Sequence, residues 1–290
     1  MVLKSYAKLN LYLEVLNRRK DNYHNIKTLF ERISLCDKIT LKSRPDKQIK
    51  IISHSPDIPK DSSNLAFRSA KLLQDSLKID KGVEIKITKR IPVGSGMGGG
   101  SSNAAFVLLG LNKLWKLHLS RVKLVGFAKR IGSDVPFFIY NLPFALGEAK
   151  GDEIKPLSSL RGVRLWHVLV VPKIKVSTPM IYKNWDKNRE ILGLTRPKYN
   201  VNILTLALRR KDLAAVNLAL FNNLEPITAK IYPELKPIRD KLNLLGLQSI
   251  LMSGSGPAIM AIASSRKEAV SAYRQLKKDK FWQVFVTRTF

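Results

Sequence analysis

Five glycines fall within the nine residues Gly94-Ser-Gly-Met-Gly-Gly-Gly-Ser-Ser102. The preceding residues 83–87 alternate apolar and polar side chains as a strand does, and helical spacing follows the glycines. Glycine lets backbone N–H groups approach an anion closely, and a helix N-terminus adds a favourable dipole. The segment is therefore predicted to bind phosphate, since a flexible linker needs neither the strand nor the helix.

The loop does not fit the usual glycine-rich nucleotide motifs. Gly94, Gly96 and Gly99 satisfy G-x-G-x-x-G, but the strand before them is not apolar throughout, as a central parallel strand would be. No Asp or Glu lies between Glu84 and Asp134, so the acid expected about 20 residues on for a ribose is missing. The Gly-Lys-Ser/Thr of a P-loop is also missing from the loop.

The acid-free interval between Glu84 and Asp134 is strongly basic, which favours phosphorylated ligands. Asp134 ends this interval, in Gly132-Ser-Asp-Val-Pro136. A single acid after a long basic stretch is conspicuous, so Asp134 is a candidate site residue, and a helix cap or a surface ion pair is the structural alternative.

The overall charge raises the possibility that the protein binds nucleic acid. The 51 Lys and Arg against 22 Asp and Glu give a net charge of +29, which is typical of proteins that meet polyanions. The basic residues are scattered, however, without zinc-finger or RNP-type motifs, so a lysine-rich surface is the simpler interpretation. The single Cys36 and the four separated histidines argue against disulfides and structural zinc. Without an apolar run of about 18 residues or a secretory signal, we expect a cytoplasmic protein that does not enter a membrane.

Periodicity predicts an α+β fold in both halves of the chain. In the first half we expect strands over 2–16, 28–35, 38–43, 48–53, 83–87 and 137–145, and helices over 64–77 (capped by Ser62 and Ser63), from Ser101 or Ser102 to 117, and from the cap Ser120 to 131. In the second half we expect strands over 165–171, 248–252, 258–263 and 283–287, and helices over 178–186, 201–219, 233–245 and 267–277. The polar segment 148–162 predicts a boundary between domains 1–155 and 156–290.

Several motifs together resemble those of the GHMP kinases. In chain order they are Ala7-Lys-Leu-Asn10, Asp21-Asn-Tyr-His24, the loop from Pro92 to Ser102, Gly132-Ser-Asp-Val-Pro136 and Ser253-Gly-Ser-Gly-Pro257. Tyr-His with Thr28-Leu-Phe30 resembles the branch whose substrate carries a cytidine diphosphate. The resemblance implies an N-terminal domain like domain 2 of ribosomal protein S5, a ferredoxin-like C-terminal domain and an active site in the cleft between them. It also implies ATP with Mg²⁺ and a small-molecule substrate, with no specific nucleic acid and no obligate protein partner.

The resemblance also implies residue roles. Lys8 and Asp134 match the catalytic pair. The residues implied to bind ATP are Pro92, Val93, Gly94, Ser95, Gly96, Met97, Gly98, Gly99, Gly100, Ser101 and Ser102, with Asn64 and Lys89 near the adenine. The residues implied to bind the substrate are Asn10, Tyr23, His24, Phe30, Thr178, Pro179 and Tyr182. No metal ligand is firmly assigned, and Ser101 or Ser102 is the candidate contact for Mg²⁺ or a phosphate.

Alternatives remain at this point. Taken alone, His24 is more typical of an ordinary histidine, and Phe30 and Tyr182 of core residues. A pyrimidine, however, needs aromatic faces and a hydrogen-bonding edge. Asn22 stands where the family usually has Gly, and Asn tolerates the left-handed backbone better than most residues. A GHMP kinase for mevalonate, homoserine or a sugar would share the loop but not Tyr23, His24 and Phe30. An RNA-binding protein would leave the loop and Asp134 without a role.

Overall fold

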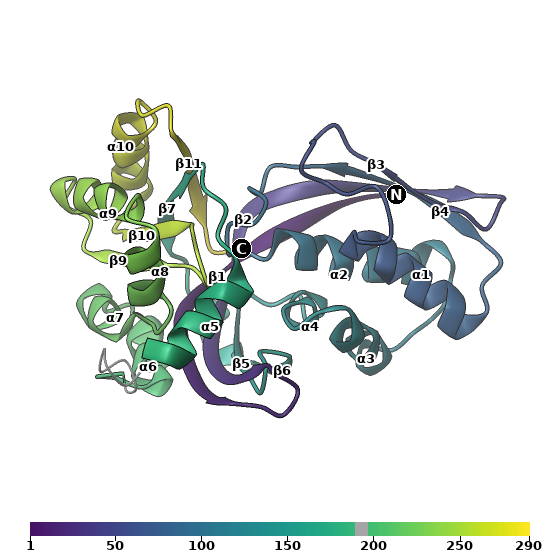
Figure 1. The fold of residues 1–290 in the computed structure, drawn as a ribbon, viewed down its shortest axis with the longest axis horizontal. Coiled ribbons are helices and arrows are strands. Elements are labelled where there is room, and N and C mark those ends of the chain that lie inside the picture. Colours follow the sequence, from purple (N-terminus) through teal and green to yellow (C-terminus); the bar gives the residue numbers. More distant parts are fainter. Residues whose placement is uncertain (189–196) are drawn as a thin grey trace.

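The computed structural model describes residues 1–188 and 197–290, and these residues form two sheets with helices packed on them (Figure 1). The first sheet has the order β3-β4-β2-β1-β8, with β5 and β6 beside β2. Its strands are β1 (Val2–Arg18), β2 (His24–Arg44), β3 (Ile49–Ile52), β4 (Gly82–Thr88), β5 (Phe144–Glu148), β6 (Glu153–Pro156) and β8 (Phe221–Asn222). The mixed α+β prediction is confirmed.

One continuous strand, β2, replaces the two strands predicted over 28–35 and 38–43. The gap between the two predicted strands contains Asp37, which is fully buried. Its carboxylate lies 2.5 Å from Lys89 Nζ and accepts hydrogen bonds from the backbone of Arg90 and Ile91, so the strand carries a paired charge rather than a turn. This satisfies the usual condition for burying an ionised group.

Four helices accompany the first sheet: α1 (Leu65–Leu77), α2 (Gly99–Leu114), α3 (Arg121–Ile131) and α4 (Val135–Ile139). Ser120 caps α3 by accepting from Lys123 N, as predicted. The cap of α1 is Asn64 rather than Ser62 or Ser63. The predicted start of α2 at Ser101 or Ser102 is wrong, because Gly98 takes a left-handed conformation and the helix begins directly after it.

The strand predicted over 137–145 is also wrong. Residues 135–139 form the short helix α4, in which Pro136 occupies the first turn, and the strand β5 starts only at Phe144. Proline fits the first turn of a helix because its missing N–H has no partner there. All five residues of α4 are buried, so the apolar run that suggested a strand belongs to a buried helix.

The second sheet has the order β11-β7-β10-β9. Its strands are β7 (Trp166–Pro172), β9 (Ser249–Met252), β10 (Ile259–Ala263) and β11 (Trp282–Arg288), and its helices are α5 (Thr178–Asn188), α6 (Val201–Arg210), α7 (Leu213–Ala219), α8 (Glu225–Ile231), α9 (Leu235–Leu244) and α10 (Arg266–Leu276). A short 3₁₀ helix, η1 (Ser158–Leu160), precedes β7. The predicted helix 201–219 is two helices, because Lys211 is left-handed and Asp212 caps α7.

The two halves of the chain are interwoven at one strand. β6 ends at Pro156, but β8 returns from the second half and pairs in parallel with β1, with Tyr12 opposite Phe221 and Leu13 opposite Asn222. Neither β8 nor α8 was predicted. The division into domains 1–155 and 156–290 stays a prediction. None of the described helices is long and apolar enough to cross a membrane.

Candidate active site

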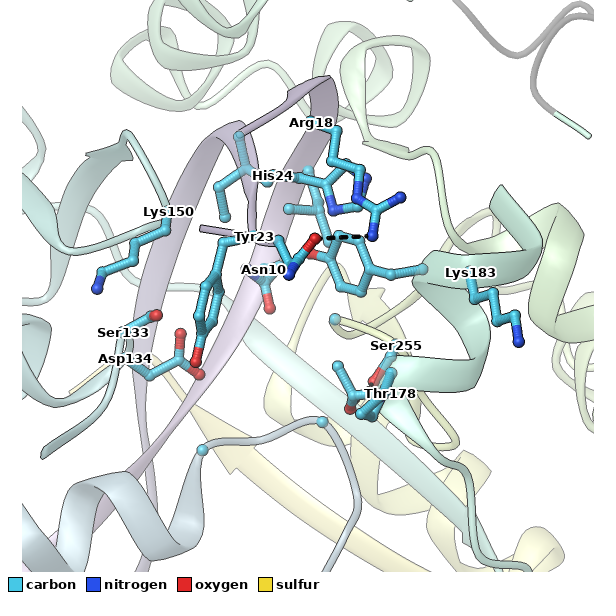
Figure 2. A pocket seen from close by; sticks show the side chains of 18 of the residues that line it. Asn10, Arg18, Tyr23, His24, Ser133, Asp134, Lys150, Thr178, Lys183 and Ser255 are labelled. Atoms are coloured by element: carbon cyan, nitrogen blue, oxygen red, sulfur yellow. Dashed lines mark hydrogen bonds between the residues drawn. The ribbon is translucent and has the colours of Figure 1, made fainter. Parts of the chain in front are cut away.

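A cavity of about 960 Å³ lies where the two halves meet (Figure 2). Its walls come from β1, β2, the glycine loop, the start of α4, the β5–β6 turn, α5 and the loop after β9. Twelve of the predicted site residues line it: Lys8, Asn10, Tyr23, His24, Phe30, Gly96, Gly98, Ser101, Asp134, Thr178, Pro179 and Tyr182. Motifs from distant parts of the chain are thus brought to one place.

Lys8, Asn10 and Asp134 form one end of this cavity, which we call the catalytic end. Lys8 is 4% exposed, and its Nζ lies 2.5 Å from Asn10 Oδ1 and 3.4 Å from Asp134 Oδ2. Asn10 Nδ2 in turn donates to Thr28 Oγ1 at 2.8 Å, which fixes the orientation of the amide. A lysine held between an amide oxygen and a carboxylate presents its charge in one defined position.

Asp134 stands at the N-cap position of α4, but its side chain makes no capping hydrogen bond. The alternative that Asp134 caps a helix is therefore wrong. The ion pair exists, but its partner is the buried Lys8 inside the cavity rather than a surface lysine. The side chain of Asp134 keeps 32% of its surface exposed, so the carboxylate stays open to a ligand.

The glycine loop is fixed to both halves of the protein. Lys8 N donates to Met97 O at 3.0 Å, Ala258 N donates to Ser95 O at 3.2 Å, and Ser253 Oγ donates to Gly96 O at 3.2 Å. A Cβ on Gly96 would lie 2.2 Å from the carbonyl oxygen of Ser253, so only glycine fits there. The loop thus has the fixed backbone that a phosphate cradle requires.

The two candidate serines behave differently. Ser101 lines the cavity, whereas Ser102 is fully buried with its Oγ 2.7 Å from Ser5 Oγ. The described residues contain no group of three or more His, Cys, Asp or Glu that could hold a metal ion. Magnesium bound with a nucleotide, however, needs only one or two protein oxygens in addition to phosphates and water. The Asp134 carboxylate and the Ser101 hydroxyl fit that requirement.

The remaining residues predicted to bind ATP do not line this cavity: Pro92, Val93, Gly94, Ser95, Met97, Gly99, Gly100, Ser102, Asn64 and Lys89. Both ends of the Asn64 amide are engaged, since Oδ1 accepts from Ala66 N at 2.9 Å and Nδ2 donates to Pro59 O at 2.7 Å. Lys89 pairs with Asp37. The adenine-binding role of Asn64 and Lys89 stays a prediction.

His24, Tyr182 and Tyr23 line a second part of the cavity, which we call the recognition end. His24 is 7% exposed, and its ring stacks on Tyr182 with centroids 5.0 Å apart. Burial, and secondarily the charge of Asp134, raise the pKa of the Tyr182 hydroxyl, so that group stays neutral. Tyr23 is 56% exposed, with Lys150 Nζ 5.3 Å from its ring centroid. Figure 2 shows the Tyr23 ring extending toward Ser133 and Asp134.

Other predicted residues also line the cavity. Thr178 Oγ1 lies 2.7 Å from Ser255 Oγ at the start of α5, which joins this helix to the loop after β9. Phe30 is only 1% exposed and packs on Phe137 with centroids 4.9 Å apart, so most of its ring belongs to the core. Asn22 adopts φ 65°, so the expected left-handed turn is confirmed.

The cavity also contains residues that were not predicted: Leu13, Arg18, Asp21, Asn22, Ile26, Ser133, Lys150, Lys183, Asp186, Lys187, Gly254 and Ser255. Asp21, Asn22, Ser133, Gly254 and Ser255 lie within motifs that had been recognised, so the motifs themselves were an available signal. Five charged residues had no such signal: Arg18, Lys150, Lys183, Asp186 and Lys187. They belong to the end of β1, the β5–β6 turn and α5, and only the fold brings these elements together.

Comparison with known families identifies the class. The model of the GHMP kinase N-terminal domain matches residues 64–141, and that of the GHMP kinase C-terminal domain matches residues 204–281. The two matches include the glycine loop, Asp134 and the Gly-Ser-Gly motif near Pro257. The chain belongs to the GHMP kinases.

Individual relatives narrow the family further. The 4-diphosphocytidyl-2-C-methyl-D-erythritol kinase of Geobacillus kaustophilus is 40% identical over 95% of this chain and 92% of its own length, and that of Acetivibrio thermocellus is 38% identical over 99% and 98%. A crystal structure of 4-(cytidine 5'-diphospho)-2C-methyl-D-erythritol kinase covers 100% of both chains with 32% identity and a TM-score of 0.83. Within the GHMP kinases, the chain is a member of this kinase family. The L. major mevalonate kinase, at 19% identity and a TM-score of 0.77, shares the fold.

Proposed function

We propose that this protein transfers the γ-phosphoryl group of ATP to the 2-hydroxyl of 4-(cytidine 5'-diphospho)-2-C-methyl-D-erythritol, giving the 2-phosphate and ADP. The reaction is a step of the non-mevalonate, or methylerythritol phosphate, route to isoprenoid precursors. The observation that carries the proposal is the single cavity that joins the Lys8–Asp134 pair and the glycine loop to the aromatic pair His24 and Tyr182. The cytoplasmic location stays a prediction.

The chemistry follows from the catalytic end. A hydroxyl placed beside Asp134 gives its proton to the carboxylate as the oxygen attacks the γ-phosphorus. Lys8, which is 4% exposed and held by Asn10 Oδ1, polarises that hydroxyl and stabilises the developing charge. The backbone of Gly96 and Gly98 and the hydroxyl of Ser101 face the phosphates of ATP. Asp134 and Ser101 are the residues that would hold magnesium bound with ATP, and the ion would neutralise phosphate charge there.

The recognition end accounts for the nucleotide part of the substrate. Tyr23 and Tyr182 offer aromatic faces, and stacking on such a face contributes about 1–3 kcal/mol per base. His24 offers a hydrogen-bonding edge beside them. Lys150, Lys183 and Lys187 add positive charge around the same cavity, which favours a diphosphate.

The test is the release of ADP by the purified protein with ATP, Mg²⁺ and the cytidine substrate, with ³¹P NMR of the product. We expect ADP release that requires the cytidine substrate, and a new phosphomonoester signal. Mevalonate and homoserine are the control acceptors, and we expect neither to be turned over. Faster phosphorylation of either control would contradict the proposal.

A further inference from the structure

One contact in the recognition end joins the two halves of the chain and has no part in the mechanism above. His24, the first residue of β2, meets Asp186 of α5, with Nε2 and Oδ1 2.7 Å apart. The His24 side chain is 5% exposed and that of Asp186 25% exposed. A contact this short between largely buried groups constrains where the ring carries its proton.

An ionised carboxylate only accepts hydrogen bonds, so the imidazole must donate from Nε2. In the neutral ring, the other nitrogen, Nδ1, is then an acceptor. Among the described residues Nδ1 has no hydrogen-bond partner, and His24 lines the cavity. The pairing therefore leaves an acceptor available to a ligand.

A second group, Arg18, also faces Asp186. Its Nη1 lies 3.9 Å from Asp186 Oδ2, so a permanent cation already faces this carboxylate. The imidazole does not need to be protonated to compensate the charge of Asp186. Lys183 and Lys187, on the same helix and around the same cavity, add further positive charge.

Helix α5 also sets the plane of the ring. Tyr182 stacks on His24 with an interplanar angle of 28°, and Trp185 meets its edge at 86° with centroids 5.7 Å apart. Tyr182, Trp185 and Asp186 are near neighbours on α5, so a single helix determines both the orientation and the tautomer of His24. Precise placement of this kind is what a site needs to distinguish two similar ligands.

Cytosine and uracil differ in one exocyclic group, which the imidazole ring would contact if it lay beside the base. Cytosine presents an amino group, which donates, where uracil presents a carbonyl oxygen, which accepts. A lone pair on Nδ1 matches the first and repels the second. We propose that Asp186 is a positioning residue that holds His24 in the Nε2–H tautomer and thereby sets the preference for cytosine over uracil.

This inference rests on the proposed function, so its test has a part that needs no substrate. The measurement without substrate is ¹⁵N NMR of the ring nitrogens in histidine-labelled protein at about pH 8, where an unperturbed histidine is neutral. His24→Gln assigns the signal among the four histidines. We expect an unprotonated Nδ1 in the wild-type protein, and a mixture of tautomers in Asp186→Ala. A protonated Nδ1 in the wild type overturns the proposal, even if Asp186→Ala does not fold.

The second part compares kcat/KM for the cytidine substrate and its uridine analogue. Asp186→Ala should lower their ratio by about tenfold to a hundredfold, the range for one mismatched buried hydrogen bond, while kcat for the cytidine substrate changes little. The matched control is Asn184→Ala, which alters the same helix at a residue outside the cavity and should leave the ratio unchanged.

The outcomes separate the two proposals. A wild-type protein that uses neither substrate, or both equally well, contradicts the proposed function. A selective wild type whose Asp186→Ala variant keeps the ratio or the tautomer overturns the role of Asp186 alone.

Discussion

The two ends of the cavity are built on different principles. At the catalytic end, Lys8 and Asn10 are 4% and 3% exposed, lie on one strand and bond to neighbours inside the first sheet. At the recognition end, Tyr23 is 56% exposed on a hairpin turn, and the partners of His24 come from α5 in the other half of the chain. The side-chain partners of Lys8 and Asn10 come from the first half of the chain, whereas the side chain of His24 is held by residues of the second half.

The difference has a functional meaning. Phosphoryl transfer depends on positioning the base, the cation and the phosphate within a fraction of an ångström, and buried, cross-linked groups provide this. Recognition of a nucleotide base needs aromatic faces and one hydrogen-bonding edge, which surface turns and a helix can supply. We therefore expect changes at the catalytic end to act on kcat, and changes at the recognition end to act on KM and selectivity.

The largest effect is expected from Asp134→Asn. Removing a general base costs about a hundredfold to ten-thousandfold in rate, so kcat should fall on that scale while the backbone cradle still binds ATP. The control is Asp75→Asn, which alters a surface carboxylate paired with Lys71 and should not change turnover. Near-normal kcat in Asp134→Asn, measured by ADP release, would leave Asp134 as an ion-pair partner only.

A second effect should distinguish two glycines of the same loop. Gly98 and Gly94 have φ 67° and 66°, so alanine strains the backbone equally at both. Only at Gly98 would the new Cβ meet Lys8, 3.1 Å from Cγ and 3.2 Å from Cε, whereas Gly94 has nothing within 4 Å. We expect Gly98→Ala to lower kcat by about tenfold, or 1.4 kcal/mol, and Gly94→Ala by much less. Equal losses in the two variants would mean that backbone strain, not Lys8, is responsible.

A third effect belongs to the recognition end. His24→Ala removes the stacking partner of Tyr182 and the polar edge, so KM for the cytidine substrate should rise by about tenfold to a hundredfold, with selectivity over the uridine analogue reduced. The value of kcat should change little. Steady-state kinetics with both substrates measure this, and a fall in kcat with unchanged KM would place His24 in the chemical step.

The smallest effect is expected from Asn22→Gly. Glycine relieves the left-handed strain at φ 65° but loses the exposed hydrogen bond from Arg18 Nη2 to Asn22 Oδ1 at 3.0 Å. These terms oppose each other, so the free energy of unfolding should change by less than about 1 kcal/mol. Denaturant unfolding measures this directly, and turnover should remain within about twofold of the wild type, since less than 0.4 kcal/mol separates such rates. A large loss of activity would show that the side chain of Asn22 touches the substrate.

Local patterns in the sequence were enough to predict much of this molecule. The glycine loop, the Ser120 cap and the tolerance of Asn22 for positive φ each depend on a few adjacent residues and one backbone requirement. Lys8 and Asp134 were singled out because they lie in motifs, and they form an ion pair in the cavity. In these cases a short stretch of sequence is enough, because the residues that decide the local structure are adjacent in the chain.

The errors arose where distant packing decides the outcome. The gap predicted between residues 35 and 38 contains Asp37, whose partner, Lys89, lies 52 positions away. The apolar run after Asp134 fits a buried helix as well as a strand. Asp186 carries no motif and becomes part of the site only through a contact with His24, 162 positions away.

The most direct test of the division between the two ends is a pair of double-mutant cycles on kcat/KM. One cycle combines Lys8→Met with Asp134→Asn, whose wild-type groups lie 3.4 Å apart, and the other combines Lys8→Met with His24→Ala. Groups that act as a unit are strongly non-additive, whereas separate sites add within about 0.5 kcal/mol. We predict that the Lys8–Asp134 double variant is little worse than either single variant, and that the effects of Lys8→Met and His24→Ala multiply. Strong coupling between Lys8 and His24, or additivity between Lys8 and Asp134, would contradict the account.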